Sequence, residues 1–180
     1  MKDELTDLAS HPVRQLVADA VRAMCGQPDR CQVNAEIDGE GRLEIIVEPT
    51  QADRGIINGD RGRTWKAIEF ITERAAWYET KQVAIARLPE SYEGFREGNN
   101  GRPTPLTVEQ LLALTKRLAC AALGREVEIK SVRDTRGWKF VVSDTDHKAD
   151  DRKVVFALDE ILFPAGKANG TFIRVKTERR

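Results

Sequence analysis

The residues with the clearest chemical potential lie in one short stretch, residues 53–68. Two glycines, Gly59 and Gly62, enclose Asp60 and Arg61, and a helical pattern begins directly after them. Glycine adopts positive φ without steric cost and leaves neighbouring N–H groups uncovered. Where such a turn opens a helix, these groups join the free donors of the helix N-terminus, which attract an anion. The stretch therefore predicts a phosphate-binding loop.

The charges around the loop favour the same ligand. Residues 53–66 carry four basic and two acidic side chains, a local excess of +2: Arg54, Arg61, Arg63, Lys66, Asp53 and Asp60. The whole chain has 29 basic and 29 acidic residues and no net charge. Such a balance argues against broad wrapping of duplex DNA, which usually needs a basic domain or stripe. Any contact with nucleic acid is therefore expected to be local.

The order hydrophobic-x-Gly-x-x-Gly-Arg-Thr-x-Lys-Ala-Ile resembles the nucleic-acid-binding loop of K-homology (KH) domains, above all the small bacterial single-KH RNA-binding proteins. In that family the GxxG loop joins two short helices and clamps about four single-stranded nucleotides by their backbone. The resemblance implies that residues 59–62 form the loop and that residues 63–68 open the second helix. Two positions depart from the pattern: Asn58 replaces an aliphatic residue, and Asp60 places a carboxylate in the loop.

The nucleic-acid-binding residues implied by this resemblance are those of the loop and its flanking helices: Arg54, Ile56, Ile57, Gly59, Asp60, Arg61, Gly62, Arg63, Thr64 and Lys66. Basic side chains would give charge-assisted contacts to phosphates. Ile56 and Ile57, together with Ala67, would floor an apolar groove for bases. The alternative is that the aliphatic residues belong to the core and the charges form a solvated helix face.

The elements expected around the loop form a small α+β domain. Helical periodicity follows Ser10, apolar residues alternate over 31–37, and a second strand covers 43–47 after an Asp-Gly turn. A short helix over 51–58, a longer one from Thr64 to about Tyr78 and a strand over 83–88 complete the order αββααβ. This is the order of a bacterial type II KH domain, with helices on one face of a three-stranded sheet. The resemblance therefore covers residues 10–88.

The pattern begins again after a linker at 89–106 that is rich in glycine, proline and asparagine. Residues 13–16 align with 108–111 at an offset of 95 residues, and the same offset places 43–47 over 138–142. Thr107 opens a helix with a capping box, a second long helix is expected over 153–163, and a closing strand over 171–176. Residues 107–177 are therefore predicted to be a second, degenerate KH-like domain, which makes the chain a tandem repeat.

The second copy has no glycine pair at the corresponding place. Residues 144–151 contain four carboxylates against one lysine there, a local charge of −3, which would repel a phosphate. Asp144, Asp146, His147, Asp150 and Asp151 also suggest a hard cation. The central glycine and terminal glutamate of an EF-hand loop are missing, however. We therefore expect a solvated loop that caps the next helix, and no metal.

Several function classes are disfavoured by the sequence. No apolar run approaches the length of a membrane span, and residues 1–5 lack the apolar core of a signal peptide, so we expect a cytoplasmic protein. Cys25, Cys31 and Cys120 have no metal spacing and are expected to be buried thiols. No nucleophile elbow, Walker loop or zinc-protease motif occurs. We expect no enzyme and no cofactor.

The resemblance and the duplication together predict a bacterial protein that binds single-stranded RNA through its first domain. Single-stranded DNA stays open as a partner, because a contact to the 2′-hydroxyl is not visible in a sequence. The second domain would extend the surface, position the first domain or mediate self-association. The rival hypothesis is a protein-interaction or dimerisation module on a KH fold that has lost nucleic-acid binding, as Asn58 and Asp60 would indicate.

Overall fold

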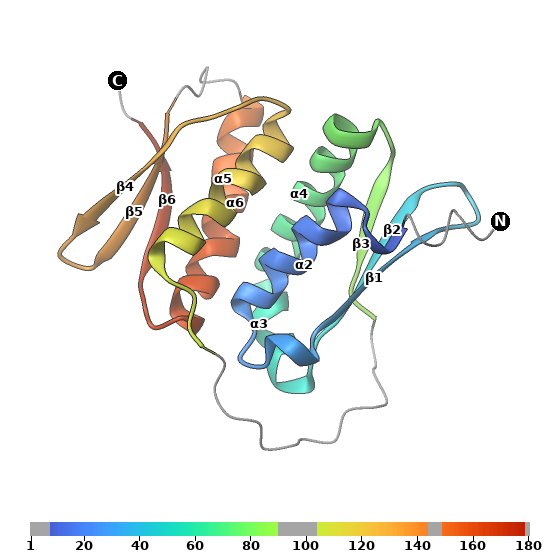
Figure 1. The fold of residues 1–180 in the computed structure, drawn as a ribbon, viewed down its shortest axis with the longest axis horizontal. Coiled ribbons are helices and arrows are strands. Elements are labelled where there is room, and N and C mark those ends of the chain that lie inside the picture. Colours follow the sequence, from blue (N-terminus) through green and yellow to red (C-terminus); the bar gives the residue numbers. More distant parts are fainter. Residues whose placement is uncertain (1–7, 90–103, 144–148, 179–180) are drawn as a thin grey trace.

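The structure, a computed structural model, describes residues 8–89, 104–143 and 149–178, which form two α+β units (Figure 1). The first unit contains α2 (Pro12–Met24), the short 3₁₀ helix η1 (Pro28–Arg30), β1 (Gln32–Ile37), β2 (Leu43–Glu48), α3 (Gln51–Asn58), the 3₁₀ turn η2 (Asp60–Gly62), α4 (Arg63–Thr80) and β3 (Ala84–Arg87). The second contains α5 (Val108–Leu123), β4 (Ile129–Asp134), β5 (Gly137–Val142), α6 (Ala149–Ala168) and β6 (Ile173–Thr177). The α+β class and the element order predicted for the first unit are confirmed.

Each unit builds one three-stranded mixed sheet of the same topology. The strand orders are β1-β2-β3 and β4-β5-β6. The hairpin strands pair antiparallel, whereas β2 with β3 and β5 with β6 pair parallel. A parallel partner needs a long crossover connection, and α4 and α6 provide it in the two units. In the described part of the chain, the five helices α2–α6 pack against these two sheets.

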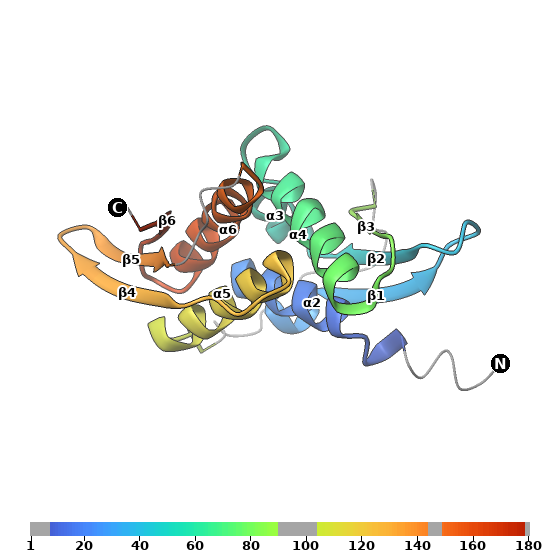
Figure 2. The same cartoon turned by 90° about the horizontal axis from the view of Figure 1, so that it is seen from above.

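The helices of both units lie in a shared middle layer between the two sheets (Figure 2). α4 packs against α5 and α6, and α2 packs against α6. Hydrogen bonds cross this seam: Arg74 Nε donates to the Ala122 carbonyl at 3.1 Å, and Asn169 Nδ2 donates to the Ala23 carbonyl at 2.9 Å. The buried apolar residues of both units form one cluster. The two units thus bury their helical faces against each other.

Several element ends differ from the sequence prediction for local reasons. His11, not Ser10, caps α2: its Nδ1 accepts the Val13 N–H at 3.3 Å, and Pro12 occupies the first turn. α6 begins at Ala149 and continues through Pro164 to Ala168, instead of covering only 153–163. Packing against both units stabilises α6 across a residue that would end an isolated helix. The capping box of Thr107 and Gln110 is confirmed, with bonds of 3.2 and 2.8 Å.

The cysteines are free, and their burial differs. Cys25 and Cys31 are buried as predicted, but Cys120 on α5 is only partly buried, so the prediction was wrong for that thiol. A side-chain hydrogen bond with Cys31, together with burial, raises the pKa of Cys25. Among the residues that the structure describes, no helix is both long and apolar enough to cross a membrane.

Candidate nucleic-acid interface

The glycine loop joins α3 to α4 through a tight left-handed turn. Gly59 has φ 70° and ψ 178°, Arg61 has φ 53° and ψ 31°, and Gly62 has φ 74° and ψ 14°. The Gly59 N–H closes α3 by donating to the Gly55 carbonyl at 2.9 Å. Both glycines therefore adopt the positive φ that the sequence predicts.

The two glycines are required for different reasons. A Cβ on Gly59 would lie 2.2 Å from Thr64 Oγ1 and 2.9 Å from the Thr64 nitrogen, so no side chain fits there. A Cβ on Gly62 would meet nothing closer than Asn58 Oδ1 at 3.7 Å, so only the backbone angle demands glycine. Thr64 is 4% exposed and packs beneath Gly59. Its side chain supports the loop from inside and is not presented to solvent.

The N-terminus of α4 lacks a side-chain cap. Gly62 occupies the N-cap position, and no side chain of the described residues accepts a hydrogen bond there as a cap. Two amides of the turn are used internally: the Gly62 N–H donates to the Gly59 carbonyl at 3.3 Å, and the Arg63 N–H donates to the Asp60 carbonyl. The positive end of the α4 dipole is therefore covered only by main chain, which is the arrangement that attracts an anion.

Exposed charges surround this helix end. Asp60, Arg61, Arg63 and Lys66 are all exposed. Arg63 Nη2 lies 2.8 Å from Asp60 Oδ2, and Arg63 Nη1 lies 4.0 Å from Glu160 Oε1 on α6. An ion pair this open to solvent stabilises by only about 0–1 kcal/mol, so a phosphate can compete with Asp60 for the guanidinium.

The other predicted site residues lie in different environments. Ile57 is fully buried, so its expected place in the floor of a base-binding groove was wrong: it points into the core. Ala67 is 6% exposed and largely belongs to the core as well, whereas Ile56 is 40% exposed beside the loop. Arg54 is half-buried and donates to the Pro89 carbonyl, which ties α3 to the segment that follows β3.

Asp53 is a structural residue. It is 3% exposed and accepts the N–H groups of Gly26 at 2.8 Å and Gln27 at 3.3 Å, together with the Thr50 hydroxyl at 2.9 Å. Its carboxylate therefore joins the end of α2 to the start of α3 and does not face the loop. The exposed charge at the loop remains positive, since Arg61, Arg63 and Lys66 outnumber Asp60.

Sequence reasoning missed the contribution of α6 to this surface. A cavity of about 510 Å³ lies between the loop and the C-terminal half of α6, where Glu160, Phe163 and Lys167 line it. Phe156 and Phe163 are 61% and 40% exposed. Their spacing of seven residues places them on one face of a helix, with basic residues on either side, but the sequence prediction assigned neither ring a role.

The acidic stretch of the second unit is only partly within the described residues. Residues 144–148, which include Asp144, Asp146 and His147, lie outside them. Asp151 is 6% exposed and pairs with Arg125 at 2.8 Å, while Asp150 lies 3.5 Å from Lys153 Nζ and 3.6 Å from Arg74 Nη1. In residues 8–89, 104–143 and 149–178, no group of three or more potential metal ligands is assembled.

A comparison with protein-family models gives no match, and no curated protein is similar enough to this chain to count as a relative. The interpretation of the site therefore depends on the residues and geometry of the chain itself.

Proposed function

We propose that the protein binds single-stranded RNA by its sugar–phosphate backbone at η2 and the N-terminus of α4. The observation that carries this proposal is the uncapped start of α4 behind two positive-φ glycines, with Arg61, Arg63 and Lys66 exposed around it. The element order αββααβ of the first unit supports its assignment as a type II KH-like domain. The described residues of the second unit follow the order αββαβ, with the single helix α6 between β5 and β6, so the αββααβ order predicted for this copy is not found there, and no glycine loop is described.

The chemistry of this site favours low sequence specificity. A phosphate oxygen would accept hydrogen bonds near the α4 dipole and charge-assisted bonds from Arg61 and Lys66, while Arg63 exchanges its partner Asp60 for the phosphate. Contacts of this kind position a strand but do not read its bases. Ile56 is the exposed apolar residue nearest to the loop in sequence that could meet a base.

The direct test is a loop variant with a matched control. Arg61→Asp/Gly62→Asp should weaken binding of a labelled twelve-nucleotide RNA at least about tenfold in fluorescence anisotropy, because two carboxylates then face the phosphate. The control Gly41→Asp/Arg136→Asp makes the same charge change at another positive-φ glycine and another exposed arginine. Circular dichroism should show both variants folded. Equal affinities for the two variants would refute the proposal.

Salt dependence gives an independent measure of the same contacts. For single-stranded nucleic acid, the logarithm of the affinity should fall against the logarithm of the salt concentration with a slope of about −0.7 per neutralised phosphate. The loop variant should show a smaller slope than the unchanged protein. A salt-independent affinity would mean that phosphates are not what the loop contacts.

The rival, a protein-interaction module, is favoured by one observation: Asp60 already neutralises Arg63 within the loop. Asp60→Asn separates the two functions. If the loop binds RNA, removing this carboxylate frees Arg63 and should raise the affinity about threefold. If the unit acts only in protein association, the same change should leave the protein without measurable affinity for RNA.

A further inference from the structure

A groove extends from the glycine loop along the seam between α4 and α6. The two helices run antiparallel, because Arg63 near the start of α4 meets Glu160 at 4.0 Å, whereas Arg74 further along α4 meets Asp150 at 3.6 Å near the start of α6. Figure 2 shows α6 beside α4, with α3 at the same side of the molecule. The cavity at the loop and a second cavity of about 420 Å³ adjoin, since Arg63 lines both. We call these two cavities together the α4–α6 groove.

Basic side chains dominate the rim of the α4–α6 groove. They come from both units of the chain: Arg63, Lys66, Arg152, Lys153 and Lys167. The acidic residues that line it are Asp60 and Glu160, both at the loop end, and Asp150 lies 3.5 Å from Lys153 just outside it. Among the residues that the structure describes, the lining of the second cavity contains four basic residues and no acidic one. A polyanion is therefore the complementary ligand.

The floor of the groove is apolar and includes aromatic rings. Phe70, Phe156, Ala67 and Ala157 line the second cavity between the basic residues, and Phe163 lines the first. Phe156 is 61% exposed, although its neighbours along α6 are all buried: Val154, Val155, Ala157 and Leu158. A ring exposed between cations is the combination on which single-stranded nucleic acids stack their bases.

The length of the groove fits a short strand. From Arg152 to Lys167, α6 rises about 22 Å. Stacked nucleotides advance about 3.4 Å each along one strand, so this length matches about six of them. The groove therefore begins where the glycine loop would release a strand and continues for more nucleotides than the loop itself clamps.

Charge also argues against the other possible occupants. A second copy of the chain that docked groove to groove would present the same basic rim and would be repelled at this seam. A purely apolar peptide would leave the four cations of the second cavity without anionic partners. A strand that brings both phosphates and flat bases satisfies both features of the groove.

We infer that the α4–α6 groove holds the single-stranded RNA that continues from the glycine loop. Arg152, Lys153 and Lys167 of the second unit bind its phosphates, and Phe156 stacks on a base. This inference rests on the proposed function, and it gives the second unit a direct part in binding although it has no described glycine loop.

The test uses the full chain, labelled RNA strands of four and twelve nucleotides, and two variants. Arg152→Glu/Lys153→Glu should lower the affinity for the long strand about tenfold or more and reduce the magnitude of the salt slope by about 1.4, for two lost phosphates. Phe156→Ala should lower it about tenfold by removing one stacking surface. NMR shifts of the Gly59 and Gly62 amides on addition of the short strand should persist in both variants, because the loop is unchanged.

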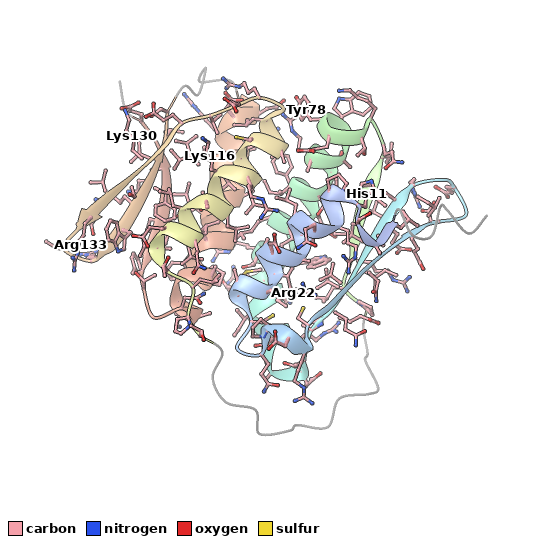
Figure 3. All side chains as sticks on the ribbon, in the orientation of Figure 1. His11, Arg22, Tyr78, Lys116, Lys130 and Arg133 are labelled. Carbon is pink, nitrogen blue, oxygen red and sulfur yellow. The ribbon has the colours of Figure 1, made fainter. Side chains whose placement is uncertain are left out.

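Two control variants match the size of these changes. Lys130→Glu/Lys176→Glu makes the same charge change on the outer face of the second sheet, where both residues are exposed (Lys130 is labelled in Figure 3). Trp77→Ala removes an aromatic ring that is 56% exposed at the far end of α4. Both controls should retain the affinity for the long strand within about twofold.

The possible failures are distinguishable. If the unchanged protein binds neither strand, the proposed function itself is wrong. If the loop variant loses binding while both groove variants keep it, the function stands and the groove inference is wrong. If Lys130→Glu/Lys176→Glu lowered the affinity for the long strand equally, the attraction would be general and not specific to the groove. If Phe156→Ala abolished self-association without changing the affinity for RNA, the groove would belong to a second copy. Either result overturns the inference.

Discussion

The two units share their strand topology and differ in the charge of the outer faces of their sheets. On the outer face of the first sheet, Glu36, Glu44 and Glu48 occur with Arg87, whereas the outer face of the second carries Lys130, Lys139, Arg174 and Lys176 with Asp134. The inward positions stay apolar in both, for example Val33, Ile45 and Val47 against Phe140, Val142 and Val175. The inward residues that form the core therefore preserve the fold, while the surface charge is free to diverge.

The same contrast holds for the basic surfaces at which we propose that RNA binds. The first unit concentrates its cations at the glycine loop, although its sheet face is acidic. The second unit has an acidic stretch at the corresponding place in the sequence. Along α6, however, it presents Lys167 to the cavity at the glycine loop and Arg152 and Lys153 to the cavity beside α4. The charge counted along a short stretch of sequence thus describes the loop. It does not describe the surface that α6 adds beside the loop in the folded chain.

The sharpest test of how the units depend on each other is Gly124→Ala. Gly124 ends α5 with φ 66°, and a Cβ there would lie 2.2 Å from Cδ1 of Tyr78 on α4 of the first unit. Figure 3 labels Tyr78, at the end of α4. Backbone strain and overpacking together should lower the free energy of unfolding by about 2–4 kcal/mol. Urea denaturation followed by fluorescence and by circular dichroism measures the change.

Gly41→Ala is the matched control for this prediction. Gly41 has φ 77°, but a Cβ there would meet nothing within 4 Å, so only the backbone strain of about 1–2 kcal/mol applies. Equal destabilisation by both changes would mean that Tyr78 moves aside freely and that the seam between the units is loosely packed.

Arg61→Asn should separate stability from binding within the loop of the first unit. Arg61 has φ 53°, a conformation that asparagine adopts more readily, so the free energy of unfolding should rise by about 0.5–1 kcal/mol. Loss of the guanidinium should lower the affinity for RNA about threefold or more. Lys81, at φ 57° at the end of α4, is the other described non-glycine residue at positive φ. Lys81→Asn should stabilise by a similar amount without weakening binding, and a loss of affinity there would contradict the assignment of the loop.

Local signals predicted much of this architecture. The capping box of Thr107 and Gln110 and the alternation of Val33 and Ala35 in β1 depend on neighbours within a few residues, and the structure confirms them. Ile37, at the end of β1, departs from the predicted alternation because it is 47% exposed. The positive φ of Gly59 and Gly62 is equally local, because it follows from the tight turn that the two glycines permit. These features could be read from the sequence since their causes lie in the sequence nearby.

Tertiary packing determined what the sequence could not show. Ile57 lies one residue from the exposed Ile56, and only the packing of α3 on the core decides that it is the buried one. The extension of α6 past Pro164 and its place beside α4 depend on contacts between residues about ninety positions apart. For this reason Arg152, Phe156 and Lys167 were absent from the predicted site: nothing adjacent to them in sequence marks them as neighbours of the loop.

The smallest expected effect is a difference between the two hairpin turns in how the pKa of an aspartate responds to loss of its cationic partner. Asp38 accepts hydrogen bonds from the Arg42 backbone N–H at 2.9 Å and from Arg42 Nε at 2.8 Å. The backbone bond is the main reason why the pKa of Asp38 is lowered. Asp134 lies 2.6 Å from Lys139 Nζ, and that side chain is the main reason why the pKa of Asp134 is lowered. A lowered pKa means that each turn is stabilised above the ordinary carboxyl pKa of about 3.9 and loses this stabilisation as the pH falls through the lowered value.

Removing each cationic partner should therefore act unequally on the two turns. Lys139→Gln should raise the pKa of Asp134 toward its ordinary value, because the main partner is lost and only the backbone N–H donors, such as that of Arg136, remain. Arg42→Gln should move the pKa of Asp38 less, because the backbone N–H of residue 42 remains as a donor. Carboxyl carbon shifts in an NMR pH titration measure both values. If the pKa of Asp38 rose more than that of Asp134, the Asp38 carboxylate would depend mainly on the Arg42 guanidinium. The main-chain donor would then not be its principal partner.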